Sequence, residues 1–213
     1  MPANLTDWLV YFCVCMLIPA AAAYFLGCLN GAILISRFFL KEDVRSRGSG
    51  NAGLTNFLRS YGKQYAVPVI LLDVVKMVAA VVIACLFMGW TLEAKLWGGL
   101  FCVLGHMFPA LYKFKGGKGI LSSGTLLIML DWRIALVAWG TFILLVVLTR
   151  YVSLGSVVCS ATAPVSTLIF YPGRWVAFAI VLLIASLVIW CHRGNVVRLL
   201  KGTESKFTIK KKL

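Results

Sequence analysis

Two glycine-rich segments of the chain combine residue types that bind anions. The first is the polar segment 41–64, in which glycines alternate with Ser and Asn and are followed by Thr, Asn and Arg. Glycines let backbone N–H groups approach an anion closely, and an arginine guanidinium offers paired donors to phosphate oxygens. The alternative is a flexible linker whose Ser and Asn residues cap helices, but a linker seldom concentrates so many anion-binding features. The candidate phosphate-binding residues are Ser49, Gly50, Asn51, Gly53, Thr55, Asn56 and Arg59.

The second segment, "GHMFPALYKFKGGKG" at residues 105–119, places a lysine between glycines immediately before an apolar run. A glycine turn that leads into a helix N-terminus forms an anion site, to which a lysine adds a point charge. We therefore expect Gly117 and Lys118 to contact an anion as well. The spacing does not match the nucleotide-binding P-loop, which argues against a nucleotide-dependent membrane enzyme. Lys113 and Lys115 fit a role as topology signals or lipid contacts.

The two histidines of the chain stand in different settings. His106 lies within an apolar segment, where a histidine is costly and is by default a functional candidate. An interhelical hydrogen bond would also explain it. His192 begins the polar tail, and Asn195 follows three residues later, on the same face of a helix. Considered alone, His192 and Arg193 fit interfacial anchors.

Two opposite charges, Asp73 and Lys76, stand within a long apolar run. We expect them to pair with each other inside a helix bundle, either as a structural element or to orient a polar loop. No cluster of metal-ligating residues is apparent, neither histidine has the His-x4-Asp spacing of the larger acyltransferase class, and no G-x-S-x-G turn occurs. The sequence therefore predicts neither a metal nor a cofactor.

The elements that must position these residues are membrane helices. The chain of 213 residues is 61% hydrophobic and 13% charged, with a mean hydropathy of +0.93, which excludes a soluble globular protein. We predict an all-α membrane protein with seven transmembrane helices, the fourth of them short, forming a single domain over residues 1–213. The first apolar run is long or broken, with residues 8–16 in the membrane interface. The predicted segments are 8–40, 65–90, 96–112, 120–130, 132–148, 152–171 and 174–191.

The distribution of positive charge sets the predicted orientation. The chain has 21 Lys and Arg residues against seven Asp and Glu residues, a net charge of +14. Most of the cations fall in alternate connecting segments and in the tail, whereas the other side of the predicted membrane carries Lys95, Arg133 and Arg174. Because Lys and Arg stay on the cytoplasmic side, we expect the N-terminus outside, the C-terminus in the cytoplasm and both anion-binding segments on the cytoplasmic face.

Three motifs together resemble the bacterial acylphosphate:glycerol-3-phosphate acyltransferase family: "DVRSRGSGNAGLTNFLR", "GHMFPALYKFKGGKG" and "HRGNVVRLLKGTE". The resemblance runs from about Ala21 to Lys206. It implies a small enzyme of the bacterial plasma membrane with seven spans. Such an enzyme moves a fatty acyl group from acyl phosphate to glycerol 3-phosphate, which gives lysophosphatidate for phospholipid synthesis. The resemblance also implies site residues, with Ser49, Asn51, Arg59, Lys118 and Asn195 as phosphate or substrate ligands and His106 as the essential histidine. We expect His106 and Asn195 to be catalytic and His192 to bind substrate.

This sequence departs from the family pattern at a few positions outside these motifs. The first span has Gly27-Cys28-Leu29-Asn30 in place of Gly-Ser-x-Pro, Met77 follows Lys76 where the family has Gly, and residues 1–16 look like an extension. These changes bear on helix packing more than on chemistry. We expect Gly27, Asn30 and Gly31 to let helices approach closely.

The expected partners are glycerol 3-phosphate, acyl phosphate and membrane lipid, with no nucleic acid and no metal. The proton of the acceptor hydroxyl has two possible destinations. His106 removes it as a general base, or a substrate phosphate takes it while His106 and Asn195 hold the geometry. The alternative function is a transporter or exchanger of small organophosphates, which predicts charges near the membrane midplane. The clustering of the polar motifs on one predicted face favours the enzyme.

Overall fold

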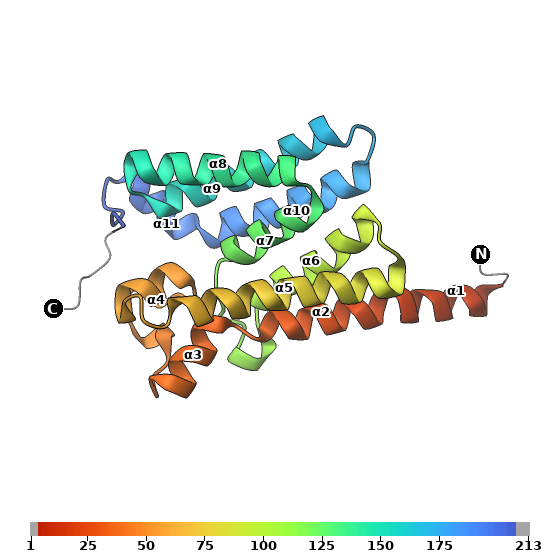
Figure 1. Ribbon diagram of the computed structural model, residues 1–213, viewed down its shortest axis with the longest axis horizontal. Coiled ribbons are helices and arrows are strands. Elements are labelled where there is room, and N and C mark those ends of the chain that lie inside the picture. The colour runs from red at the N-terminus through yellow and green to blue at the C-terminus, as the bar shows by residue number, and fades with distance from the viewer. Residues whose placement is uncertain (1–3, 208–213) are drawn as a thin grey trace.

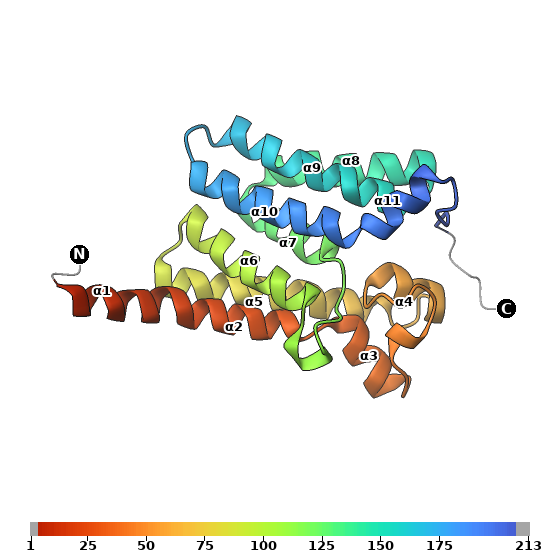
Figure 2. The same ribbon diagram turned by 180° about the vertical axis from the view of Figure 1, so that it is seen from behind.

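The computed structural model describes residues 4–207 and is helical throughout its regular structure. The expected domain of 1–213 extends outside these residues at both ends. Two layers of helices lie side by side, with a short helix between them (Figures 1 and 2). One layer contains α1 (Leu5–Phe12), η1 (Cys13–Leu17), α2 (Ile18–Cys28), α5 (Ala66–Met88) and α6 (Leu92–Met107). The other contains α8 (Trp132–Thr149), α9 (Val152–Phe170), α10 (Trp175–Cys191) and α11 (Arg193–Leu200), and α7 (Ile120–Leu130) lies between the layers.

The helices are those of an integral membrane protein. Within residues 4–207, five helices are long and apolar enough to cross a membrane: Leu5–Cys28, Ala66–Met88, Leu92–Tyr112, Trp132–Thr149 and Val152–Phe170. A sixth candidate is the pair α10 and α11, which is bent by 58°. Helix α7 has the bounds expected for the short fourth segment, and its 11 residues are fewer than an upright crossing requires. Large apolar side chains are exposed along most of these helices, as expected of surfaces that face lipid.

The first apolar run is both long and broken. Residues 8–16 continue the same helix as residues 17–28 through one π-helical turn. The run breaks at Leu29, and the separate helix α3 (Gly31–Phe39) follows. Asn30 ends the break: its Oδ1 accepts the Ile33 N–H at 3.1 Å, and its Nδ2 donates to the Ala52 carbonyl at 3.0 Å. An amide that caps one helix and binds a distant loop fixes the angle between them.

Glycines hold the first layer together by allowing backbones to touch. A Cβ on Gly27 would collide with the Cys102 carbonyl of α6, and one on Gly105 would collide with the Tyr24 carbonyl of α2. A Cβ on Gly31 would lie 2.7 Å from the Val69 carbonyl of α5. The expectation that Gly27 and Gly31 permit close helix approach is therefore confirmed.

The polar segment 41–64 is folded rather than a plain linker. It contains η2 (Val44–Ser46) and α4 (Leu54–Tyr61), which pack with α3 around a small core that includes the fully buried Phe57. Helices α3, α4 and α11 gather at one end of the molecule, opposite α1 (Figure 1). The turn η3 (Ala110–Tyr112) links α6 to the loop before α7. The segments that carry the three motifs therefore meet at the same end.

Candidate active site

A cavity of about 470 Å³ lies at this end of the molecule, with walls from both layers. Its size falls in the range typical of small-ligand sites. Two residues expected at the site, Gly50 and Gly117, do not line it, although each adjoins a residue that does. The expected site residues that line the cavity are Ser49, Asn51, Gly53, Thr55, Asn56, Arg59, His106, Lys118, His192 and Asn195.

The loop before α4 is ordered by a single amide. Asn56 is buried; its Oδ1 accepts the Ser49 N–H at 2.9 Å, and its Nδ2 donates to the carbonyls of Val44, Arg47 and Asn51 at 3.0–3.2 Å. With both ends of its amide occupied, Asn56 shapes the loop, which differs from the expected role as a ligand. Gly50 has a φ of +71° in the same loop, a conformation that glycine adopts without strain.

Two helix N-termini open onto the cavity. Helix α4 begins after Gly53 and α7 begins after Gly119, and neither cap residue has a side chain that could bind the first-turn N–H groups. Both cap residues line the cavity, as do Leu54 and Thr55 of α4 and Ile120 and Leu121 of α7. Uncapped N–H groups and the positive end of a helix dipole favour an anion.

A network of charged and polar groups forms the opposite wall. Lys118 donates to Asn195 Oδ1, and Asn195 Nδ2 donates to Glu204 Oε1 at 2.7 Å. Glu204 also accepts from Ser153 Oγ and Arg198 Nε, each at 2.7 Å. Burial lowers the pKa of Lys118 to about 8. Burial acts to raise the pKa of Glu204, but hydrogen bonds from Asn195, Ser153 and Arg198 lower it overall.

Sequence reasoning missed Glu204, Ser153 and Arg198 as site residues, although all three line the cavity. Glu204 carried a recognisable signal, because it is the single acidic residue of the basic tail and ends the third motif. Ser153 carried no such signal, since it lies inside an apolar segment.

The C-terminal tail also contacts Arg59. Its Nη1 donates to Ser205 Oγ at 2.9 Å, and its Nη2 donates to the Ser205 carbonyl at 3.1 Å. Arg59 thus faces the cavity with its guanidinium held by the tail.

The two histidines line the same cavity but have different partners. His192 is buried, and its Nδ1 lies 2.8 Å from the Val188 carbonyl. A carbonyl only accepts, so Nδ1 carries the proton and Nε2 of a neutral His192 is an acceptor. His106 lies at the end of α6, and its Nδ1 is 2.8 Å from Lys76 Nζ. Lys76 forms the expected pair with Asp73, at 2.6 Å.

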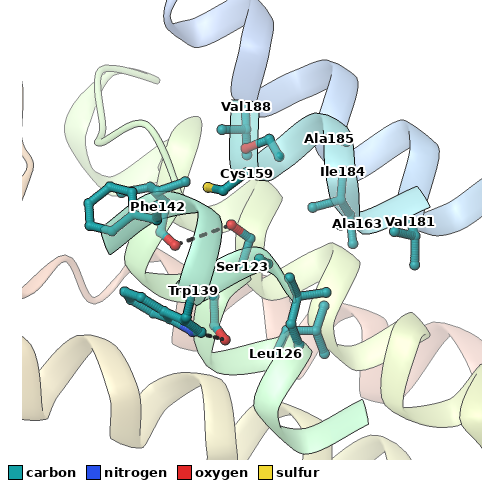
Figure 3. Close-up of a pocket in the computed structure, with 15 residues that line it drawn as sticks. Ser123, Leu126, Trp139, Phe142, Cys159, Ala163, Val181, Ile184, Ala185 and Val188 are labelled. Atoms are coloured by element: carbon teal, nitrogen blue, oxygen red, sulfur yellow. Dashed lines mark hydrogen bonds between the residues drawn. The ribbon is translucent and has the colours of Figure 1, made fainter. Parts of the chain in front are cut away.

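A small apolar pocket of about 40 Å³ adjoins the polar cavity (Figure 3). Ile120, Trp139 and Phe142 belong to the walls of both. Trp139 donates from Nε1 to the Gly124 carbonyl at 3.2 Å, which fixes its indole between the two spaces. The remaining walls are mostly small or aliphatic side chains of α7, α9 and α10, among them Ala163 and Ala185. This arrangement suits a molecule with a phosphate at one end and a hydrocarbon chain at the other.

The chain matches known proteins over nearly its whole length. The family model described as glycerol-3-phosphate acyltransferase matches residues 17–202. The glycerol-3-phosphate acyltransferase of Thermoanaerobacter pseudethanolicus is 42% identical over 189 residues, which cover 89% of this chain and 94% of that protein. The enzyme of the same description from Coxiella burnetii (strain CbuG_Q212) is 41% identical over 190 residues, covering 89% and 97%.

Solved structures agree with the sequence comparison. The crystal structure of the integral membrane glycerol 3-phosphate acyltransferase PlsY in its glycerol 3-phosphate form matches with a TM-score of 0.82 and 34% identity. The match covers 90% of this chain and 95% of that one. The lysophosphatidic acid form of the same protein matches with a TM-score of 0.79 and 33% identity, covering 91% and 95%. With its fold, its motifs and its cavity in agreement, the chain belongs to the glycerol-3-phosphate acyltransferase family.

Proposed function

We propose that the protein is an enzyme of the bacterial plasma membrane that transfers a fatty acyl group from acyl phosphate to glycerol 3-phosphate. The observation that carries the proposal is the cavity, where two uncapped helix N-termini, Lys118 and Arg59 stand beside an apolar pocket. Both substrates bear a phosphate, and the donor also bears a hydrocarbon chain. The names of the relatives support glycerol 3-phosphate as the acceptor.

The reaction requires one bond to form and one to break. A hydroxyl oxygen of glycerol 3-phosphate attacks the acyl carbon, the bond from that carbon to the phosphate oxygen breaks, and inorganic phosphate leaves. The acyl phosphate is a mixed anhydride and is already activated, so no covalent enzyme intermediate is needed. Alignment of the hydroxyl with the acyl carbon supplies much of the rate gain, and the departing phosphate takes the hydroxyl proton.

The N-termini of α4 and α7 supply a cradle for phosphate. Lys118 adds a cation to the same cavity, and Arg59 offers a planar fork once it exchanges its contacts with Ser205 for phosphate oxygens. These donors stabilise the negative charge on the leaving phosphate and on the oxyanion of the transition state. Their positions depend on Asn56, which holds the loop before α4.

His192 is suited to orient the acceptor hydroxyl. Its Nδ1–H is engaged by the Val188 carbonyl, so its Nε2 offers a lone pair to the hydroxyl proton. Asn195, three residues later, links this region to Lys118 and Glu204. Of the two routes for the proton, this geometry favours transfer to a substrate phosphate, with side chains holding the reacting groups in place.

The acyl chain is proposed to enter the apolar pocket behind Trp139 and Phe142. Burial of each methylene group contributes about 0.8 kcal/mol, so a pocket that holds even part of the chain favours long donors.

The proposed topology has seven crossings, including α7 and the bent pair α10 and α11, with the N-terminus outside and the cavity facing the cytoplasm. Protease protection of terminal tags in right-side-out vesicles tests this orientation.

The decisive experiment uses purified protein in detergent with labelled glycerol 3-phosphate. Palmitoyl phosphate, palmitoyl-coenzyme A and palmitoyl-acyl carrier protein are supplied separately, and we expect lysophosphatidate from palmitoyl phosphate without any added coenzyme or carrier. An inactive control is His192→Ala, whose side chain has no hydrogen-bond acceptor. Uptake of glycerol 3-phosphate into sealed vesicles without any product would refute the enzyme and select the transporter.

A further inference from the structure

A buried ion pair stands where the first helix breaks. Asp73 and Lys76 of α5 are 2% and 4% exposed, and their charged atoms lie 2.6 Å apart. Lys76 Nζ also lies 3.3 Å from the Gly27 carbonyl and 3.2 Å from the Leu29 carbonyl, at the end of α2. Asp73 Oδ1 accepts the Gly31 N–H, at the start of α3, at 3.2 Å.

These contacts match each charge to the helix end that favours it. A break leaves carbonyls unsatisfied at the end of α2 and N–H groups unsatisfied at the start of α3. The Lys76 ammonium meets the carbonyls, and the Asp73 carboxylate meets the N–H, which also agrees with the sign of each helix dipole. The pair therefore stabilises the break, but this role does not explain a fourth contact of Lys76.

That fourth contact is with His106. The distance from Lys76 Nζ to His106 Nδ1 is 2.8 Å, and an ammonium has only donors, so Nδ1 accepts. A neutral His106 must then carry its proton on Nε2. Among the described residues, Nε2 has no hydrogen-bond partner, and His106 lines the cavity. A Cβ added to Gly117 would meet Nε2, which puts this atom beside the glycine loop that precedes Lys118.

We propose that Lys76 is a positioning residue that holds His106 in the Nε2–H tautomer, and that this N–H donates to a phosphate oxygen of a bound substrate. The identity of that phosphate rests on the proposed function. His106 is then a donor that binds charge and cannot act as a general base at Nε2. His192 has the opposite tautomer, fixed by the Val188 carbonyl, so the cavity presents one histidine donor and one histidine acceptor.

The tautomer is measured directly by nitrogen NMR of the full chain labelled with ¹⁵N-histidine. The chain has two histidines, so a spectrum of His192→Gln assigns both rings. We expect His106 to show an unprotonated Nδ1 and a protonated Nε2, and His192 to show the reverse. A proton on Nδ1 of His106 would overturn the proposal. The measurement needs no substrate, so it stands even if the proposed reaction is not observed.

Substrate contact is tested by adding glycerol 3-phosphate and palmitoyl phosphate separately to the labelled protein. A shift of the His106 Nε2–H resonance with one of them identifies the phosphate that it binds. The absence of a shift with either, at concentrations that saturate activity, would overturn the contact. If the proposed function is wrong, no lysophosphatidate will form, but His106 will still show the Nε2–H tautomer by NMR.

The role of Lys76 is tested with two matched double variants that avoid a buried unpaired charge. Asp73→Asn with Lys76→Gln keeps a neutral donor for His106, whereas Asp73→Asn with Lys76→Met removes it. We expect the Met variant to lose the single tautomer and to have a kcat/KM lower than the Gln variant by roughly 2-fold to 10-fold, the effect of one neutral hydrogen bond. Arg174→Gln, which removes an exposed ion pair with Glu93, is the control and should match wild type. Equal kcat/KM and equal spectra in the two double variants would overturn the role of Lys76.

Discussion

Lys118 should make substrate binding depend on pH in a way that its replacement by arginine abolishes. Burial lowers its pKa to about 8, and it lines the same cavity as the N-termini of α4 and α7. Only the protonated side chain attracts phosphate, so affinity is present below this pKa and is lost as pH rises through it. A phosphate monoester has its second pKa near 6, so the substrate charge does not change in this range.

The size of the effect follows from the charged fraction. With a pKa of about 8, about nine-tenths of Lys118 is protonated at pH 7 and about one-tenth at pH 9. We therefore expect KM for glycerol 3-phosphate to rise about tenfold between these values, with a smaller change in kcat, because the bound phosphate keeps the lysine charged. Lys118→Met should raise KM at pH 7 by roughly 10-fold to 150-fold, the effect of one charge-assisted hydrogen bond.

The assay is steady-state formation of lysophosphatidate at several pH values, with activity recovered after return to pH 7 to exclude denaturation. Lys118→Arg stays charged throughout and should show a flat KM. Lys113→Gln, an exposed lysine of the same loop, should keep the wild-type profile. The reasoning is refuted if wild type shows no rise in KM up to pH 9, or if Lys118→Arg shows the same rise as wild type.

Three further predictions test other parts of the site. Gly117→Ala should reduce activity at least roughly tenfold, because its Cβ would collide with the His106 ring. Gly140→Ala, in open space on α8, is the control: it should leave activity unchanged and add up to about 1 kcal/mol of stability. Equal activities of the two variants would contradict this prediction. Asn195→Ala should lower kcat by about 100-fold in the same assay, since it removes the hydrogen bonds that join Lys118 to Glu204. Wild-type turnover in this variant would exclude a catalytic role for Asn195. Ala163→Leu should lower kcat/KM for palmitoyl phosphate more than for octanoyl phosphate, by roughly tenfold in the ratio, because it fills the apolar pocket; an unchanged ratio would place the chain elsewhere.

Hydropathy predicted the helices well because it is a local property of each segment. The bounds of α7 and the starts of α8 and α9 agree with the expected segments to the residue. Hydropathy did not show that residues 8–16 and 17–28 form one helix, since apolar residues that favour the interface also continue a helix. Their role in the membrane depends on whether the helix ends after them, and here it runs on to Cys28 without a break.

Residue type and spacing alone identified the glycine-rich segments, Lys118, His106 and the Asp73–Lys76 pair, because anion donors and charges within apolar segments are recognisable in the sequence. The tertiary structure alone decided how these groups are used. It occupied the Asn56 amide with backbone, brought Glu204 and Ser153 into the wall, and joined Lys76 to His106. Hydrogen-bond partners come from helices that are distant in the chain, so a residue's tautomer and free donors are fixed only when those helices pack.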